Sequence, residues 1–312
     1  AGVGVTAVMD VDLARAAQVA NQCGGSTVYD DANRLIADDD VDAVVIASPD
    51  PTHAALAITC IKAGKPLLCE KPLATSATNA RQVMDAEVTG DKRLLQLGFM
   101  REYDPAHRQV KETVDGGALG HPLFFRGVHT NLADGNARTV DDVIVNSAIH
   151  DIHTAHWLLG PQCGPVANVF TRYIPAVPDR PQSCRFALID LTFATGALAT
   201  IEFNADAGYG YEVRVDIVGE KGAASVNGLQ EMRLRLDGLR AQWIEPEWLS
   251  RFDRAYIEEA QAWVQSLRRG QPSGPSTWDG YRSLVVADAC IASARSGQPE
   301  DVPAMERPAL YD

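Results

Sequence analysis

The sequence has little positive charge and no long hydrophobic run. In its 312 residues, 28 Lys and Arg stand against 41 Asp and Glu, for a formal net charge of −13. This balance argues against nucleic acid or an anionic membrane surface as a partner, because both require a basic face that displaces counterions. No apolar stretch is long enough to span a bilayer, and we find no signal peptide. We therefore expect a cytoplasmic protein with neither kind of partner.

Cysteine is scarce and scattered. The six cysteines are Cys23, Cys60, Cys69, Cys163, Cys184 and Cys290. They form no C-x-x-C pair and no disulfide framework, which favours buried thiols in a reducing compartment. With 46% hydrophobic residues, the chain is long enough to bury the cores of two domains.

The first residues match a dinucleotide-binding turn without its context. Gly2, Gly4 and Ala7 satisfy the pattern G-x-G-x-x-G/A. That turn works when a strand runs into it and a helix starts from it, so that helix amides face a pyrophosphate. Here no strand can precede Gly2, and the β-branched, alternating residues that follow predict a strand instead. We therefore interpret GVTAVMD as a strand that ends at Asp10.

Residues 3 to about 118 alternate short apolar strands with helical patterns. We predict strands in GVTAVMD, near TVYDD and within residues 41–49, 65–72 and 93–100, and helices over residues 13–23, 31–39, 51–64 and 76–88. Near-continuous apolar strands joined by helices are typical of a parallel sheet covered on both faces. The first 120 residues are therefore predicted to form a doubly wound α/β domain.

The pattern changes after about residue 120. A strand-like PLFFRGVHT is followed by a helical segment over residues 146–160, and two helical patterns over 253–270 and 278–297 end the chain. Between them lie the β runs VANVFTRYI, CRFALIDLTFA, GALATIEFNA, YEVRVDIVGE, GAASVN, MRLRL and AQWIE. Such runs, joined by short turns, indicate a large and mainly antiparallel sheet. Residues 121–312 are predicted to form this second, α+β domain.

Asp10 is the first candidate site residue. It ends the first predicted strand, where a doubly wound fold places the carboxylate that accepts the adenosine-ribose hydroxyls. Its charge would repel a 2′-phosphate, which favours NAD over NADP. The alternative is a structural role at the start of the helix that begins near Asp12.

The most specific motif is CEKPLATS, residues 69–76, at the carboxyl end of a predicted strand. Open α/β sheets build their ligand crevice at that edge. Further stretches are GFMREYDPAHRQVKE, HDIHTAHWLLG, YGYEVRVDIVGEKG and GPSTWDGYRSLVVADAC. Together they make the whole chain resemble the Gfo/Idh/MocA oxidoreductase family, and within it the inositol 2-dehydrogenase branch.

The resemblance implies the architecture and the chemistry. It implies a Rossmann domain over residues 1–120, followed by an α+β domain with an open sheet over residues 121–312. It also implies NAD-dependent oxidation of a secondary hydroxyl of inositol or a related cyclic polyol. A homotetramer built on the open sheet is common in the family.

The cofactor side of the site is carried over from the family motifs. Ser48, Pro49 and His53 of ASPDPTHA fall in the loop that usually lines the dinucleotide. Glu70 lies beside the cofactor, and Lys71 matches the catalytic lysine that also contacts it. The ammonium of Lys71 can stabilise a developing alkoxide.

The substrate side is carried over in the same way. Arg101 of GFMREYD, His129 and Asn131 of VHTN, and Tyr209 and Tyr211 of YGY match positions where the inositol branch has polar groups around the substrate. A polyol needs such a ring of donors and acceptors. Each of these residues taken singly could instead be a satisfied structural polar group.

His150 matches the catalytic histidine of the family and also a substrate contact. A histidine suits removal of the hydroxyl proton as hydride leaves. The residue four before it is usually aspartate, but here it is Asn146, which can orient the ring through its amide oxygen without stabilising the imidazolium by charge. The aspartate commonly found three after the histidine is replaced by His153. These two departures bear on the substrate and on the strength of the base.

A metal site is the other interpretation of HDIHTAH. His150 and His153 lie one helical turn apart, but no recognised spacing supplies a third ligand. We predict no metal, and we interpret His156 beside Trp157 as a packed histidine.

The family pattern also predicts that further residues precede Ala1. The glycine turn should precede Asp10 by about 20 residues. We therefore expect roughly 25 to 30 residues, with the first strand, its glycine loop and its helix, to precede residue 1.

Two other functions stay open at this level. One is oxidation of another sugar, an aldose or an inositol of the scyllo type, because a polar pocket does not name a stereoisomer. The other is a catalytically silent sugar or nucleotide sensor on the same fold, suggested by Asn146 and the missing glycine turn. The presence of both Lys71 and His150 favours an enzyme.

Overall fold

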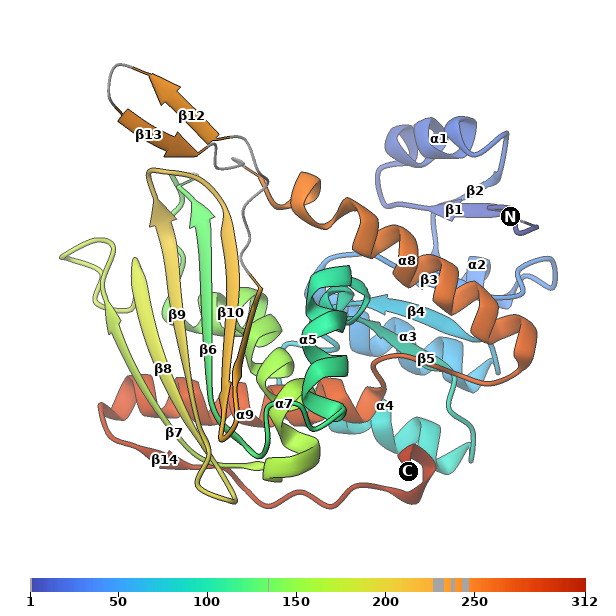
Figure 1. Cartoon of the computed structure of the whole chain (residues 1–312). Helices are drawn as coiled ribbons and strands as arrows, with labels where there is room; N and C mark the ends of the chain where they lie inside the picture. The colour runs from blue at the N-terminus through green and yellow to red at the C-terminus, as the bar shows by residue number, and fades with distance from the viewer. Residues whose placement is uncertain (1, 134, 227–232, 237–238, 243–246) are drawn as a thin grey trace. The chain divides into compact units, whose positions relative to one another are not determined.

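The chain divides into two compact units (Figure 1). The computed structural model describes residues 2–133, 135–226, 233–236, 239–242 and 247–312. The first unit comprises Ala1–Gly98, Ala260–Tyr281 and Glu306–Asp312, and the second comprises Phe99–Glu259 and Arg282–Met305. The first unit thus ends its N-terminal segment at residue 98, and residues 99–120 belong to the second unit, where α5 (Pro105–Asp115) contacts α7 (Ile149–Cys163). The predicted domain boundary near residue 120 stays a prediction.

The first unit alternates strands and helices as predicted. Its strands are β1 (Ala7–Met9), β2 (Thr27–Tyr29), β3 (Val44–Ile46), β4 (Leu67–Glu70) and β5 (Leu95–Gly98), and its helical segments are α1 (Leu13–Gln22), α2 (Ala32–Ala37), η1 (Asp50–Thr52), α3 (His53–Lys62), α4 (Ala77–Thr89) and η4 (Ala309–Tyr311). Asp12, Asp31 and Ser76 cap α1, α2 and α4, because their side chains accept hydrogen bonds from the first free helix amides. GVTAVMD thus contains a strand, as its β-branched alternation predicted.

The parallel strands of this unit form two separate sheets. β1 pairs with β2, and β3, β4 and β5 pair in that order. The parallel pairing was predicted, and within the described residues no strand pairing joins β1 to β3. Val45 in β3 is 58% exposed, so one face of this strand lacks helix cover. The expected strand before residue 1 stays a prediction.

Segments near the C-terminus complete the first unit. The backbone carbonyl of Pro275 accepts a hydrogen bond of 2.9 Å from the amide of Leu97 in β5. Glu87 on α4 is fully buried, and its carboxylate accepts hydrogen bonds from the hydroxyls of Thr277 and Tyr311. Side-chain hydrogen bonds thus hold distant parts of the chain on the Rossmann-type core.

The second unit is built on a large sheet. Its strands are β6 (Pro122–Leu132), β7 (Val166–Ile174), β8 (Phe186–Phe193), β9 (Leu198–Ala207), β10 (Glu212–Gly219), β11 (Ala223–Val226) and β14 (Glu300–Asp301), and its helical segments are η2 (Met100–Tyr103), α5, α6 (Val140–Val143), the π-helix η3 (Ile144–Ala148) and α7. A separate hairpin joins β12 (Arg233–Leu236) and β13 (Leu239–Gln242). The predicted run AQWIE extends past β13 and lies partly outside the described residues. Helix α8 (Trp248–Arg269) begins in the second unit and ends in the first, whereas α9 (Thr277–Ser296) begins in the first and ends in the second.

The seven strands have the order β11-β10-β6-β9-β8-β7-β14. β6 and β9 run parallel, and the other neighbours in this order run antiparallel, which confirms the mainly antiparallel prediction. Burial alternates along β8, where Ile189 and Leu191 are buried and Leu188 and Asp190 are half-buried. Because side chains alternate between faces, this pattern gives the sheet an inner face, against which α7 packs, and an open outer face.

The described part of the chain has no helix that is both long and apolar enough to cross a membrane.

Candidate active site

The carboxyl ends of β3 and β4 carry the predicted cofactor residues. β3 and β4 are parallel neighbours, with Ile46 opposite Cys69. Ser48 and Pro49 follow β3, whereas Glu70 ends β4 and Lys71 follows it. All four therefore lie at the one sheet edge where open α/β folds build their ligand crevice.

His53 joins the two loops at this edge. The side chain is 1% exposed, its Nδ1 lies 2.7 Å from the carbonyl oxygen of Pro72, and its Nε2 lies 2.7 Å from that of Ser48. Each ring nitrogen thus lies within hydrogen-bond distance of a backbone carbonyl oxygen. The ring therefore bridges the loops that carry Ser48 and Lys71, and its contact with the cofactor stays a prediction.

Glu70 is a half-buried carboxylate at the same edge. Burial raises its pKa, although Lys71 and His53 oppose the shift by attraction. A Cβ on Gly98 of the neighbouring β5 would lie 3.0 Å from its Oε2, so the glycine leaves room for the carboxylate.

Asp10 directly follows β1, as predicted. Its Oδ1 accepts a hydrogen bond of 2.8 Å from the amide of Asp12, and its Oδ2 lies 3.6 Å from Arg15. The side chain keeps 26% of its surface exposed. The N-cap of α1 is Asp12 and not Asp10, but Asp10 still contacts the start of this helix, so its binding of the cofactor stays a prediction.

The second unit brings together three of the six predicted substrate residues. Arg101 on η2, His129 on β6 and Tyr211 before β10 are all buried, at 1%, 4% and 8% exposure. The rings of His129 and Tyr211 meet edge to face with centroids 5.7 Å apart. Residues from three separate segments thus form one polar cluster.

Asp151 completes this cluster and was missed by the sequence analysis. Its Oδ1 accepts a hydrogen bond of 2.5 Å from Arg101, and its Oδ2 lies 2.8 Å from Nδ1 of His129. Burial alone would raise the pKa of Asp151, but the charge of Arg101 and the hydrogen bond with His129 lower it to about 2. The signal in the sequence was its place directly after His150 in a motif already singled out.

The other ionisable groups of the cluster keep their ordinary charge states. Burial alone would lower the pKa of Arg101, but the attraction of Asp151 outweighs it and the pKa is raised. Burial raises the pKa of Tyr211 to about 12. The cluster therefore holds one guanidinium, one carboxylate and a neutral phenol.

Two further predicted substrate residues, Tyr209 and Asn131, lie in more open places. Tyr209 is 54% exposed, and its hydroxyl lies 3.4 Å from the hydroxyl of Thr130. Asn131 is half-buried where the register of β6 against β9 shifts, between Thr130 and Leu132.

His150 lies at the start of α7, directly after a π-helical turn. Asn146 lies within that turn, η3. The plain α-helical spacing that we assumed between Asn146 and His150 is therefore not what the chain adopts, because a π-turn holds more residues per turn. Such turns recur at functional sites in proteins.

His153 has a fixed environment close to His150. Its Nε2 lies 2.8 Å from Oε1 of Glu102, and its ring stacks on Phe99 at a centroid distance of 3.8 Å. Phe99 also meets the His150 ring at 6.0 Å, edge to face. His153 therefore occupies the place of the usual aspartate with a ring that is itself paired to a carboxylate.

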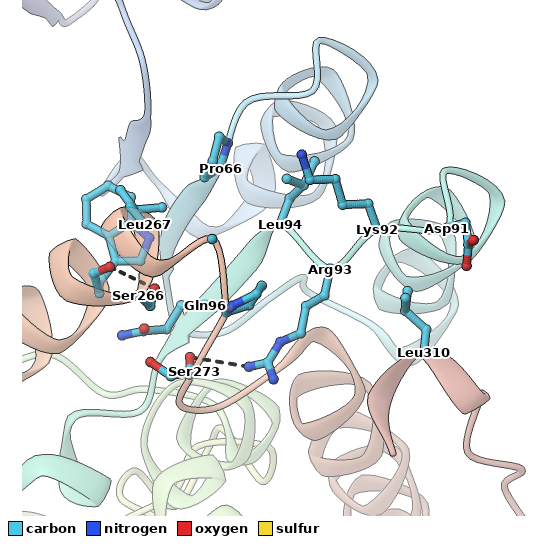
Figure 2. A pocket seen from close by; sticks show the side chains of 13 residues that line it. Pro66, Asp91, Lys92, Arg93, Leu94, Gln96, Ser266, Leu267, Ser273 and Leu310 are labelled. Carbon is cyan, nitrogen blue, oxygen red and sulfur yellow. Dashed lines mark hydrogen bonds between the residues drawn. The ribbon is translucent and has the colours of Figure 1, made fainter.

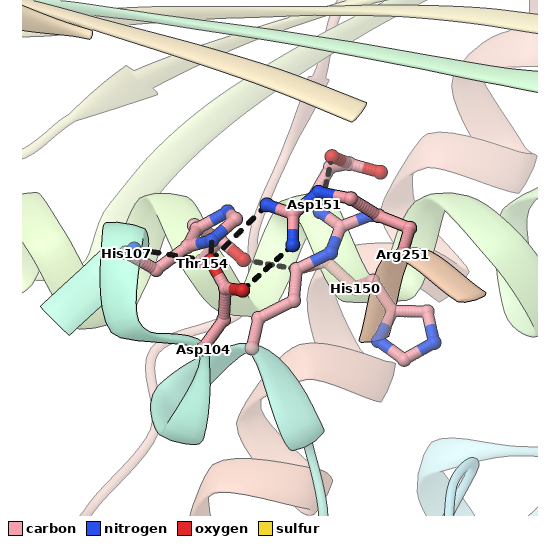
Figure 3. A network of polar contacts seen from close by, with 7 residues as sticks. Asp104, His107, His150, Asp151, Thr154 and Arg251 are labelled. Carbon is pink, nitrogen blue, oxygen red and sulfur yellow. Dashed lines mark hydrogen bonds and ion pairs between the residues drawn. The ribbon is translucent and has the colours of Figure 1, made fainter. Parts of the chain in front are cut away.

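A second group of the same unit, Asp104, His107 and Arg251, has similar chemistry, and Figure 3 draws it together with His150 and Asp151. Asp104, at the N-terminus of α5, accepts hydrogen bonds from Arg251 at 2.7 and 3.2 Å and lies 2.6 Å from Nδ1 of His107. Burial would raise the pKa of Asp104, but His107 and Arg251 hold it well below its usual range. None of these three residues was predicted in the site, and the cluster ties α8 to α5.

The cavity shown in Figure 2 lies elsewhere in the first unit. It has a volume of about 370 Å³ and is lined by residues that include Pro66, Leu94, Gln96 and Leu267. Pro66 and Leu94 directly precede β4 and β5, so the cavity lies at the amino ends of these strands. No predicted site residue lines it.

His, Cys, Asp and Glu side chains within the described ranges form no group of three or more that could hold a metal ion. His156 is buried at 1% exposure, with its Nδ1 3.2 Å from the carbonyl oxygen of Ile152, as expected for a packed histidine.

Known proteins share this sequence and fold. The family profile described as "Oxidoreductase family, NAD-binding Rossmann fold" (GFO_IDH_MocA) matches residues 2–99, and its companion, "Oxidoreductase family, C-terminal alpha/beta domain", matches residues 111–302. Inositol 2-dehydrogenase of Rubrobacter xylanophilus is 48% identical over 312 residues, 99% of this chain and 89% of the relative. Inositol 2-dehydrogenase 2 of Saccharopolyspora erythraea is 40% identical over 311 residues, 99% of this chain and 91% of the relative.

Among solved structures, myo-inositol dehydrogenase from Lactobacillus casei in complex with NAD(H) and myo-inositol has a TM-score of 0.93 to this chain. The two sequences are 30% identical, and the match covers 100% of this chain and 93% of the other.

Proposed function

Since this chain belongs to the Gfo/Idh/MocA oxidoreductase family, we propose that it is an NAD-dependent inositol 2-dehydrogenase, which oxidises a secondary hydroxyl of a cyclic polyol to a ketone. The observation that carries this proposal is the 48% identity to a named inositol 2-dehydrogenase over nearly the whole chain. It is supported by the similarity to a structure solved with NAD(H) and myo-inositol.

The charge of the buried cluster suits a neutral substrate. Arg101 and Asp151 are ion-paired at 2.5 Å and are both almost inaccessible to solvent. Because each neutralises the other, the cluster offers no uncompensated cation to a carboxylate or phosphate. A neutral polyol needs donors and acceptors without net charge, which Tyr211 and His129 can supply.

The carboxyl edge of the first unit fits NAD. The Asp10 carboxylate directly follows β1 with part of its surface exposed, so it can accept ribose hydroxyls and repel a 2′-phosphate. Ser48 and Pro49 would line the cofactor, and the loops that carry Ser48 and Lys71 are joined by the buried ring of His53. Bound NAD supplies the acceptor for hydride.

In this proposal, Lys71 stabilises charge on the substrate and His150 accepts its proton. The ammonium of Lys71 stabilises negative charge on the hydroxyl oxygen that is being oxidised. His150 accepts the hydroxyl proton as general base, with Asn146 supporting its ring. Arg101, His129, Asn131, Tyr209 and Tyr211 bind the remaining hydroxyls.

The test is NAD reduction by the protein over a panel of inositols and aldoses. We expect the highest kcat/KM with an inositol, and Lys71→Ala and His150→Ala should each lower kcat by about 100-fold or more while the fold survives. A higher kcat/KM with an aldose would support the other-sugar alternative. Inositol binding without turnover by the unmutated protein would support the sensor alternative, and near-normal rates in both variants would refute the catalytic roles.

We also propose a cytoplasmic homotetramer that assembles through the outer face of the seven-stranded sheet. All six cysteines are free and five are buried, as in proteins of reducing compartments. Leu198 and Ile174 on the outer face are 51% and 59% exposed. Sedimentation equilibrium should show a tetramer, and Leu198→Asp should give smaller species; a monomeric unmutated protein would refute the assembly.

A further inference from the structure

Asp151 lies where three elements of the second unit meet. It follows His150 directly on α7, and its side chain is fully buried. One carboxylate oxygen accepts a hydrogen bond from Nη1 of Arg101, and the other lies 2.8 Å from Nδ1 of His129. Because Arg101 belongs to η2 and His129 to β6, this carboxylate connects both elements to α7.

The contacts of Asp151 decide which nitrogen of His129 carries the proton. Nδ1 of His129 lies 2.8 Å from the carboxylate and 3.2 Å from Nη2 of Arg101. A carboxylate only accepts hydrogen bonds, so the shorter contact requires a proton on Nδ1. His129 therefore carries a proton on Nδ1, and the neutral form with this proton has its lone pair on Nε2, which can accept a hydrogen bond from a hydroxyl.

The carboxylate also lies beside Gly127 in β6. A Cβ at that position would lie 3.4 Å from Oδ1 of Asp151, an ordinary van der Waals contact, and 3.0 Å from the ring of Phe125. The fully buried carboxylate thus lies close against the strand that carries His129.

We propose that Asp151 is a positioning residue for the substrate side of the reaction: it holds the Arg101 guanidinium and keeps His129 in the tautomer whose Nε2 accepts a polyol hydroxyl. This inference rests on the proposed polyol oxidation. Asp151 directly follows His150. One turn of α7 therefore carries the proposed base and also orients the two substrate-binding groups Arg101 and His129. Asp151 acts through these groups and does not itself touch the substrate.

The Asp104 cluster is a matched control. It also consists of one aspartate, one histidine and one arginine of the same unit; Asp104 and His107 are buried, and Arg251 is half-buried. None of its members is among the proposed substrate-binding or catalytic residues. Asp104→Asn therefore weakens a comparable ion pair and leaves in place the carboxylate that contacts Arg101 and His129.

The first experiment does not depend on activity. Nitrogen NMR of the histidine side chains should show the Nδ1–H tautomer for His129. The signal is assigned to His129 if it disappears in His129→Gln. The tautomer signal should change in Asp151→Asn and persist in Asp104→Asn. An Nε2–H tautomer in the unmutated protein would overturn the inference, whatever the substrate proves to be.

The second experiment is a double-mutant cycle with the best inositol. Asp151→Asn should raise KM for the inositol by about tenfold or more, with KM for NAD changed less than about twofold. In a His129→Ala background the same change should have a smaller effect, because coupled residues are not additive. Equal effects in the two backgrounds, or the same inositol KM increase in Asp104→Asn, would overturn the inference.

A third variant covers the case in which Asp151→Asn does not fold, since it leaves the buried Arg101 charge unpaired. Arg101→Met/Asp151→Asn removes both charges, and such replacements are often tolerated. This variant should fold and lose the Nδ1–H tautomer. KM for the inositol is not its readout, because Arg101 is itself a proposed substrate-binding residue. If the variant retains the tautomer, Asp151 has no positioning role. If the unmutated protein oxidises no inositol while its NMR result is as expected, the proposed function fails and the assignment of the tautomer stands.

Discussion

Asn146 and His153 distinguish the region around His150 from the pattern of the inositol branch. Asn146 lies in the π-helical turn before His150, and it replaces a carboxylate with an uncharged amide. His153 replaces a carboxylate with an imidazole, but Glu102 lies 2.8 Å from that ring. The negative charge near position 153 thus comes from Glu102 on η2 and not from a residue of α7.

The exchange Asn146→Asp tests how this region supports the proposed base. A carboxylate near an imidazole stabilises the protonated ring. We therefore expect the acid limb of the pH profile of kcat/KM to move to higher pH in this variant. Asn146→Leu serves as the control that removes the amide without adding charge. A shift to lower pH in Asn146→Asp would show that residue 146 does not support His150.

Asp10 carries a separate prediction at the residue scale. Its partly exposed carboxylate would repel a 2′-phosphate, so the unmutated protein should prefer NAD in kcat/KM. Asp10→Ser should gain relative activity with NADP, because the repulsion is lost. Asp12→Ser is the matched control, since Asp12 caps α1 and serine is also a good cap. Equal use of NAD and NADP by the unmutated protein would contradict this role.

At the scale of elements, the second unit depends on close backbone approaches as well as on its apolar face. β10 ends at Gly219, where its register against β6 shifts. A Cβ on Gly219 would lie 2.3 Å from the carbonyl oxygen of Leu119, and backbone atoms cannot move aside as a flexible side chain can. The segment before β6 and the end of β10 therefore meet only because residue 219 has no side chain.

Gly219→Ala should accordingly destabilise the protein. We expect a loss of about 1–3 kcal/mol in the free energy of unfolding, the usual range for overpacking. Gly160→Ala is the control: Gly160 lies within α7, and a Cβ there would meet no atom within 4 Å. That change should be neutral or stabilising, because alanine favours helix. Thermal unfolding of both variants checks this prediction. Equal melting temperatures would show that residue 219 does not need to be glycine.

At the scale of the whole molecule, buried carboxylates link stability to pH. Asp104 and Asp151 both belong to the second unit, and each has a pKa below its usual range because cationic partners offset the effect of burial. A carboxyl group with a lowered folded-state pKa stabilises the fold above its unfolded pKa. That stabilisation is lost as the pH falls through the folded-state pKa.

We therefore expect the protein to lose stability steeply between about pH 4 and pH 2. Asp151 alone should contribute about 2 kcal/mol above this window, given its pKa of about 2. Asp104→Asn should have a lower melting temperature at pH 7 and a smaller further loss on acidification. Melting temperatures across the pH range provide the check. An unchanged pH slope in Asp104→Asn would show that its carboxylate is not linked to folding.

The sequence alone determined the order of elements, the fold class and the candidate catalytic positions. Apolar periodicity placed the strands and helices of the first unit, because period and capping are local properties of the chain. Motifs such as CEKPLATS and HDIHTAH located Lys71 and His150, because the chemistry of these residue types is visible without coordinates. The family profiles and relatives agree with that fold and with NAD-dependent oxidation.

Only the tertiary structure decided which groups satisfy one another. The partner of Arg101 is 50 positions away, and the pairs that Glu87 makes with Thr277 and Tyr311 span still more of the chain. The engagement of both His53 nitrogens, the π-turn at Asn146 and the division at residue 98 also lay beyond any local pattern. Ion pairs and hydrogen bonds of this kind depend on distances between atoms, and folding brings those atoms together irrespective of their separation in sequence.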